Sequence, residues 1–153
     1  MNALALWRKC ADKPFGKWFF SKAISWKAPY FGSIQPLFEV LEPSRAVVSM
    51  RKRRAVQNHI GTVHAIAMCN LAELAVGTMM EVTVPATMRW LPKGMTVRYL
   101  KKATTTLTCE ATVEKIAHSP TRDLVVHAVV RDAHHTVVCE ADITMYVSPK
   151  SAP

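Results

Sequence analysis

The stretch that decides the fold is AIAMCNLAELAVGTMM, which runs from Ala65 to Met80. Almost all of its residues are apolar, and Glu73 is its only charged residue. A helix that is hydrophobic on nearly every side belongs in the core of a protein or in a membrane. Removing a lone carboxylate from water is costly there, so Glu73 must be paired, neutralised or used. We therefore expect a buried helix over 62–80 that starts at Gly61-Thr62, with a special role for Glu73.

Two features favour a soluble core helix over a membrane span. The apolar run is short for a span, which takes about 20 residues, and it carries Asn70 and Glu73 near its middle. The N-terminus also lacks the order of charged, apolar and cleavage regions of a signal peptide. We expect a cytoplasmic protein with no integral membrane span.

The cysteines support the same compartment. They show neither CxxC pairing nor the spacing of metal ligands, so we expect no metal site. We interpret the four cysteines as small, unpaired core residues in a reducing compartment. They are Cys10, Cys69, Cys109 and Cys139.

A period of two replaces the helical pattern after Pro85, where apolar and polar residues alternate. Alternation of this kind predicts half-buried antiparallel strands, and short connections such as Ala133-His134-His135 are typical of a meander. We expect an α+β fold in which a curled antiparallel sheet wraps the long apolar helix. The expected strands lie near 34–42, 45–54, 94–102, 105–117, 122–132 and 136–147.

Residues 1–33 form a distinct opening segment rich in aromatic residues and lysines. Asp12 resembles an N-cap, with Pro14 in the first turn of a helix. We expect an N-terminal helical extension, 1–33, packed on a domain that spans 34–153. A lid over an acyl pocket and a surface that touches a membrane are the alternatives for this segment.

The net charge of +9 is concentrated near the N-terminus, where residues 1–54 hold eleven Lys/Arg and three Asp/Glu. Such asymmetry indicates an anionic partner on one side of the molecule. Phosphates of a nucleotide-like group, nucleic acid and acidic lipid all fit this charge. No recognition helix or aromatic strand motif supports nucleic acid, so we expect no nucleic-acid partner.

The spacing Asn58-x5-His64-x8-Glu73 resembles the active-site pattern of the phenylacetyl-CoA type of hotdog thioesterase. In that family an Asn precedes the helix, His-Gly-Gly opens it, and an acidic residue follows nine positions after the His. Residues 94–103 resemble the third strand of the family. The run from 58 to 75 is more similar still to an uncharacterised bacterial branch of thioesterase-like proteins. The resemblance covers roughly 34–147, residues 1–33 fit only that branch, and it implies the hotdog fold.

The chain departs from the pattern where Ala65 and Ile66 replace the two glycines. The family stabilises the thioester oxyanion with a backbone N–H at this helix entrance, and a helix N-terminus leaves such donors free. Glycine would add space for the acyl group or the CoA arm. Three consequences of Ile66 stay open: a narrower site, an altered substrate preference, or lost catalysis.

Helix geometry predicts that the motif residues of one site come from two subunits. Nine residues of helix rise about 13.5 Å over two and a half turns, so His64 and Glu73 project from nearly opposite sides. Two antiparallel helices related by a dyad would bring the entrance of one beside the middle of the other. We therefore expect a composite site in a homodimer, which the resemblance also implies, with a dimer of dimers as the larger form.

The resemblance implies hydrolysis of an acyl-CoA thioester, with coenzyme A as part of the substrate and no further cofactor. Glu73 would act as general base or nucleophile, and amides at Ala65 and Ile66 would hold the oxyanion. Asn58 would orient the water or the carbonyl, while His64 would brace the helix entrance. Gly61 and Thr62 complete the expected substrate contacts. Each of these residues also has a purely structural alternative. Asn58 and Thr62 would cap the helix, His64 would be a hydrogen-bonded core histidine, and Glu73 would form a buried ion pair with Arg89 or Arg98.

The basic run before the motif has two interpretations of equal weight. On a strand its side chains would alternate between the two faces. The first interpretation is a solvated edge strand, whose charges discourage aggregation. Alternatively they would clamp CoA phosphates. The residues concerned are Arg51, Arg53 and Arg54, with Lys101 and Lys102 as further candidates.

Other function classes stay open beside the thioesterase. A non-catalytic acyl-CoA or fatty-acid binding or sensing protein is compatible with Ile66 and the aromatic opening segment. An acyl-thioester hydratase or dehydratase is disfavoured by the opposed directions of His64 and Glu73. A membrane-surface binder driven by the basic N-terminal region is the third class.

Overall fold

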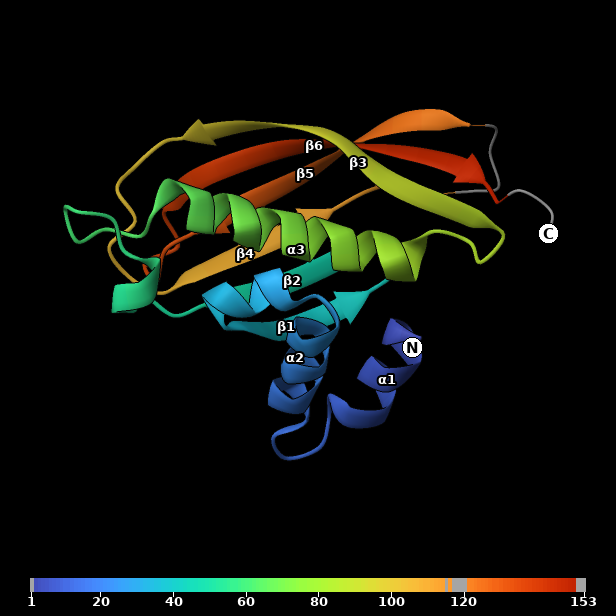
Figure 1. Ribbon diagram of the computed structural model, residues 1–153, viewed down its shortest axis with the longest axis horizontal. Coiled ribbons are helices and arrows are strands. Elements are labelled where there is room, and N and C mark those ends of the chain that lie inside the picture. The colour runs from blue at the N-terminus through green and yellow to red at the C-terminus, as the bar shows by residue number, and fades with distance from the viewer. Residues whose placement is uncertain (1, 115, 117–120, 151–153) are drawn as a thin grey trace.

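The computed structural model describes residues 2–114, 116 and 121–150. Its centre is α3, which lies along the inner face of a six-stranded antiparallel sheet that curls around it (Figure 1). The helices and short 3-10 turns are α1 Ala3–Cys10, α2 Gly16–Lys27, η1 Pro29–Ile34, η2 Arg54–Val56 and α3 Ala65–Thr83. The strands are β1 Pro36–Glu42, β2 Arg45–Met50, β3 Met88–Tyr99, β4 Leu107–Thr112, β5 Arg122–Arg131 and β6 Val137–Pro149.

The strand order is β1-β2-β4-β5-β6-β3. Strands β4, β5 and β6 form the expected meander, but β3 does not pair with β4, as a continuous meander would require. It pairs with β6 at the far edge of the sheet instead. This edge position accommodates Pro92, which has no N–H to donate, and the register shift between Pro92 and Gly94. The bulge also explains why the alternating pattern missed the first part of β3.

Strand β2 ends at Met50 and not at residue 54, as the sequence suggested. Met50 pairs with Pro36 on one side and Leu107 on the other, and both neighbouring strands begin there. Within the described part of the chain, no partner strand therefore supports β2 beyond Met50. The basic run leaves the sheet, and the expected division of its side chains between two strand faces is wrong. Similarly, β4 ends at Thr112, and the predicted end at residue 117 lies outside the described residues.

Helix α3 begins at Ala65, later than the expected start at Gly61-Thr62. The Asn58 side chain explains the delay, because its Oδ1 accepts hydrogen bonds from the N–H groups of Ile60 and Thr62, each at 3.1 Å. Gly61 has a positive φ of 76°, a conformation that glycine adopts without strain. Residues 58–62 therefore close a turn of their own before the helix.

The opening segment forms two helices, α1 and α2, which lie on the β1 side of the domain (Figure 1). Trp7, Phe20 and Phe38 stack edge to face with ring centroids 5.1 Å apart, so both helices are fastened to β1. Asp12 and Pro14 lie in the turn between the helices, and the expected N-cap at Asp12 is wrong.

Gly16 determines the start of α2. A Cβ there would lie 1.6 Å from the carbonyl oxygen of Cys10, so only glycine fits the close approach of α1 and α2.

The division of the chain into an N-terminal extension, 1–33, and a domain, 34–153, stays a prediction.

Helix α3 is, among the described residues, the one helix long and apolar enough to cross a membrane, and 56% of that stretch is buried within the fold. Its apolar side chains meet buried residues of the sheet such as Leu107 and Ile143. The cysteines Cys69, Cys109 and Cys139 are free and buried. Burial raises the pKa values of the Cys109 and Cys139 thiols, which disfavours the reactive thiolate.

Candidate active site

Helix α3 is buried over most of its surface and exposes one narrow stripe. Ile66, Glu73 and Glu81 are exposed and Gly77 is half-buried, and their spacing places all four on one face. The sequence suggested a helix buried all round, and that expectation is wrong for Glu73. The reason is that the sheet and the N-terminal helices leave this face of α3 uncovered.

Glu73 has no hydrogen-bond or ion-pair partner within the described part of the chain. The two candidate partners from the sequence are engaged elsewhere. Arg89 donates from Nε to Ser148 Oγ at 3.1 Å, and Arg98 donates to Glu140 at 2.8 Å. The alternative of a buried ion pair for Glu73 is therefore wrong in this structure.

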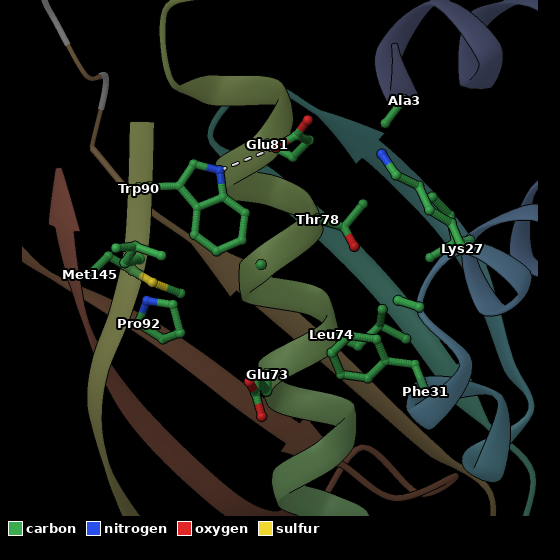
Figure 2. A pocket seen from close by; sticks show the side chains of 14 residues that line it. Ala3, Lys27, Phe31, Glu73, Leu74, Thr78, Glu81, Trp90, Pro92 and Met145 are labelled. Carbon is green, nitrogen blue, oxygen red and sulfur yellow. Dashed lines mark hydrogen bonds between the residues drawn. The ribbon is translucent and has the colours of Figure 1, made fainter. Parts of the chain in front are cut away.

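A largely apolar groove of about 440 Å³ runs along the exposed stripe. Figure 2 shows Glu73 at one end and, near the other end, the indole N–H of Trp90 donating to Glu81 at 3.3 Å. The N-terminal segment forms one wall, α3 the floor and β3 the other wall. The lining residues include Ala3, Ile24, Lys27, Phe31, Leu74, Gly77, Thr78, Pro92 and Met145. Its size lies within the range of about 300–1,000 Å³ typical of small-molecule pockets.

Gly77 lies in the floor of this groove. A Cβ at this position would meet the Trp90 ring at 3.4 Å, which is ordinary van der Waals contact. A larger side chain would extend into the space between Trp90 and the N-terminal segment. The absence of a side chain at Gly77 therefore keeps the groove open.

The entrance of α3 is capped by His64, whose Nδ1 accepts a hydrogen bond from the N–H of Ile66 at 3.1 Å. The His64 carbonyl accepts from the N–H groups of Ala67 and Met68. Among the described residues, the N–H of Ala65 has no partner. Of the two amides that the sequence proposed as oxyanion donors, the one at Ala65 is thus available, and the one at Ile66 is already engaged.

Asn58 is used inside its own turn. Besides accepting two backbone hydrogen bonds, its side chain donates from Nδ2 to Thr62 Oγ1 at 2.7 Å. The amide is therefore not oriented toward Glu73 within one chain. Gly61 and Thr62 belong to this same turn.

A small polar pocket of about 190 Å³ lies beside the helix entrance, lined in part by Tyr30, His64 and Ile66. Asn70 also lines it and is only 5% exposed. Its Nδ2 donates to Ser33 Oγ at 3.2 Å, whereas its Oδ1 has no partner among the described residues. A role for Asn70 was not predicted, although a lone amide in an apolar helix was the signal for one.

Backbone hydrogen bonds bring both basic runs to the end of the domain where α3 starts. His64 donates to the Val56 carbonyl, next to the first run, and Val63 donates to Ala103, next to the second. The side chains that are exposed there are Arg51, Arg54, Lys101 and Lys102. Arg53 differs, because its guanidinium donates to the carbonyl of Ser33 and turns inward.

Tyr99 lies on β3 with its hydroxyl 3.0 Å from Cys69 Sγ on α3. The hydrogen bond with Cys69, assisted by partial desolvation of the hydroxyl group, raises the pKa of Tyr99 to about 12. The contact ties the edge strand β3 to the first half of α3, between the helix entrance and Glu73.

Within one chain the motif residues do not converge. Ala65 and Glu73 are separated by about 12 Å of helix rise. Glu73 lines the apolar groove, whereas His64 and Ile66 line the polar pocket. The separation that the sequence predicted is therefore present, and a single chain does not assemble the proposed site.

Comparisons with known proteins agree with this architecture. Residues 16–147 match the sequence family described as a domain of unknown function, DUF4442. The crystal structure of the genomics protein APC5556 is similar to this chain, with a TM-score of 0.85. The two sequences are 46% identical, and the match covers 97% of this chain and 98% of that chain. No curated protein matches.

More distant structures carry functional names. A Pseudomonas aeruginosa protein described as a probable thioesterase is 22% identical, with 82% of this chain and 91% of that chain covered and a TM-score of 0.76. A Staphylococcus aureus thioesterase is 17% identical, with coverages of 79% and 99% and a TM-score of 0.70. At these identities the likeness concerns the fold. The chain therefore belongs to the DUF4442 family and has the α+β hotdog fold that thioesterases use.

Proposed function

We propose that this protein hydrolyses acyl-CoA thioesters at a site shared between two copies of the chain, with Glu73 as the general base. The observation that carries the proposal is the position of Glu73. It lies at one end of an apolar groove large enough for an acyl chain, and no described residue neutralises it. A free carboxylate beside an apolar groove is suited to activate water next to a bound acyl group.

The proposed reaction needs only the substrate and water. Glu73 removes a proton from water, and the oxygen of that water adds to the thioester carbonyl. The N–H of Ala65 of the partner subunit holds the resulting oxyanion, a contribution typically of about 2.7–4 kcal/mol per donor. The carbon–sulfur bond then breaks, and the thiolate takes the proton from Glu73. The products are a carboxylic acid and coenzyme A.

The exposed surfaces support a homodimer. Strand β3 is one of the two edge strands of the sheet and exposes Leu91, Met95 and Tyr99 at 57%, 38% and 49%. An unpaired edge with apolar side chains is suited to pair with a second copy. Because the exposed stripe of α3 lies beside this edge, such pairing would bring the two helices together. The available amide of one copy would then approach Glu73 of the other.

The basic side chains near the helix entrance support coenzyme A as the leaving group. Arg54, Lys101 and Lys102 are exposed at that end and are free to approach phosphates. Arg51 is exposed as well, whereas the inward contact of Arg53 makes it a supporting residue in this proposal. We propose that the adenine nucleotide lies over this basic end while the acyl chain occupies the groove.

The test is thiol release from short, medium, long and aryl acyl-CoAs by wild type, Glu73→Gln and Glu81→Gln. Glu81 is the matched control, because it is an exposed carboxylate on the same stripe and lines the same groove. We expect activity to fall by at least about a hundredfold in Glu73→Gln and to stay within a few-fold of wild type in Glu81→Gln. Turnover that survives in Glu73→Gln would remove Glu73 from the mechanism.

Exposed Ile66 at the helix entrance favours one alternative, a non-catalytic acyl-CoA or fatty-acid binding protein. Its side chain is 56% exposed where the thioesterase pattern has glycine. Binding of acyl-CoA without turnover of any substrate in the panel would establish this alternative.

A further inference from the structure

The outer face of α2 carries an unusual density of exposed aromatic rings. Phe15, Trp18, Phe19 and Trp26 are 86%, 56%, 54% and 87% exposed. Trp18 and Phe19 follow Phe15 by three and four residues, and Trp26 follows Phe19 by seven, as residues on one helical face do. Lys22 lies within the same face, with its Nζ 5.8 Å from the centre of the Trp18 ring. We call this face of α2, together with its N-cap residue Phe15 and ending at Trp26, the aromatic face.

The fully buried contacts that attach α2 to the domain do not come from the aromatic face. That attachment is made by the opposite side of the helix, where Phe20 and Ile24 are buried and Phe20 stacks between Trp7 and Phe38. Four large rings remain in water although they would gain by leaving it. A contiguous exposed apolar surface of this kind marks an interaction site.

The charge around the aromatic face identifies its partner. Residues 13–38 contain four lysines and no acidic residue. Lys13, Lys22 and Lys27 have no ion-pair partner among the described residues, and Lys17 is paired with Glu39 at 3.6 Å. A second copy of the same face would bring like charges together, which opposes self-association through it. Basic residues combined with Trp and Phe are instead the composition of helices that lie in the surface of anionic membranes.

We propose that the aromatic face of α2 docks on the surface of an anionic lipid bilayer. The rings of Phe15, Trp18, Phe19 and Trp26 lie at the boundary between headgroups and acyl chains, where aromatic residues are favoured. The lysines contact lipid phosphates. Helix α2 is placed for this contact, because it lies on the outside of the domain, on the side opposite the wall of the sheet formed by β5 and β6 (Figure 1).

The docked position would place the groove near the lipid. Lys27 and Phe31, at the end of the same segment, line the wall of the groove that contains Glu73. An acyl group that leaves or enters the bilayer therefore has a short path along the segment. The docking itself does not depend on the proposed hydrolysis, so the two proposals fail or succeed separately.

The test is co-sedimentation of the full chain with vesicles of phosphatidylcholine, with and without phosphatidylglycerol. We expect binding to the anionic vesicles that weakens as salt is raised, and little binding to the neutral ones. The variant with Trp18→Ser and Trp26→Ser should bind anionic vesicles at least about tenfold more weakly. The variant with Lys13→Gln and Lys22→Gln should lose the preference for anionic lipid.

Two controls accompany the variants. Val125→Ser removes an apolar side chain that is 54% exposed on β5 and should bind vesicles like wild type. Trp18 and Trp26 are exposed whereas Trp7 is buried, so vesicle binding should shift tryptophan fluorescence to shorter wavelengths. That shift should disappear in the tryptophan variant, whose thermal unfolding should match that of wild type.

Three results would overturn the proposal. The first is a wild-type chain that does not bind anionic vesicles, and the second is equal binding by the tryptophan variant. The third is a reduction in oligomer mass in that variant, which would assign the aromatic face to a second copy of the chain. If the tryptophan variant keeps the oligomer mass of wild type, its hydrolysis of a water-soluble short acyl thioester should be unchanged, because neither tryptophan lines the groove.

Discussion

Gly77 sets the depth of the groove beside Glu73. Its missing side chain leaves space under the Trp90 ring, and a Cβ alone would reach ordinary contact at 3.4 Å. The prediction is that Gly77→Leu fills this space and lowers kcat/KM for long acyl thioesters by at least about tenfold. Acetyl thioester turnover should change little, because a short acyl group does not reach beyond Glu73. Thiol release across a chain-length series measures both quantities.

The matched control at the same position is Gly77→Ala. Because the added methyl group fits, it should keep the chain-length profile of wild type. Replacing glycine in a helix should also raise the free energy of unfolding by up to about 1 kcal/mol. A chain-length profile unchanged in Gly77→Leu would mean that the acyl group lies elsewhere.

Tyr99 provides a prediction at high pH. Its pKa is raised to about 12 in the fold, from its ordinary value of 10.0, mainly by the hydrogen bond with Cys69 and to a smaller degree by partial desolvation of the hydroxyl group. The folded protein therefore favours the neutral phenol, and this stabilisation is complete below pH 10 and is lost as pH rises toward about 12. Wild type should lose stability between these values more steeply than Tyr99→Phe.

Urea denaturation at a series of alkaline pH values measures that difference. Ultraviolet absorbance of tyrosinate provides the independent readout, since the last tyrosine to ionise in wild type should be missing in Tyr99→Phe. Parallel stability curves for the two proteins would show that Tyr99 titrates normally.

Among the elements, α2 has two faces that act differently. Phe20 is fully buried between Trp7 and Phe38, whereas its neighbour Phe19 is 54% exposed. Phe20→Ala should lower the free energy of unfolding by about 3–5 kcal/mol, because it empties the centre of the aromatic stack. Phe19→Ala should change it by less than about 0.5 kcal/mol. Chemical denaturation measures the free energy of unfolding of both variants. Equal losses of stability would contradict the role of the aromatic stack in anchoring α2.

The elements also show what the sequence could predict. Alternation in the second half of the chain located β4, β5 and β6 because these strands are half-buried and regular. It missed the first part of β3, where Pro92 and a bulge interrupt the alternation. It also could not place β3 beside β6, since strand pairing depends on tertiary packing and not on local pattern.

The start of α3 was missed for a different reason. Rules for helix starts favour Asn and Thr as caps, and the sequence offers both in Asn58 and Thr62. These two side chains bond to each other and to their own turn, which leaves the capping of α3 to His64. The spacing of the motif made Glu73 the candidate carboxylate, and its catalytic role stays a prediction. An acyl pocket was expected, but its length and shape were not predictable, because its walls come from β3 and from the N-terminal segment.

At the scale of the whole molecule, the proposed dimer predicts that the N–H of Ala65 is needed for hydrolysis. Ala65 is the first residue of α3, a position where proline is tolerated because its N–H has no partner within the helix. His64 before it is already extended, with φ −65° and ψ 138°, as a residue preceding proline must be. Ala65→Pro should therefore remove the available amide without unfolding the helix, and it should lower thioester hydrolysis by about a hundredfold.

Mixing inactive variants tests whether the site is shared. If Glu73 of one copy works with Ala65 of the other, a heterodimer of Glu73→Gln and Ala65→Pro contains one intact site. After joint unfolding and refolding of equal amounts, activity should return to about a quarter of the wild-type value by random pairing. Activity that stays at the level of the separate variants would place both groups in one subunit.

Strand β6 has a consequence for how the chain is made. It is hydrogen-bonded to β5 on one side and to β3 on the other, so it joins the meander to the strand that follows α3. During synthesis on the ribosome, β3 emerges long before this neighbour exists, and the apolar side of α3 has only part of its cover. Such distant pairings are slow to form. The nascent chain therefore depends on its last strand, and its maturation should require protection by chaperones until residues 137–149 are released.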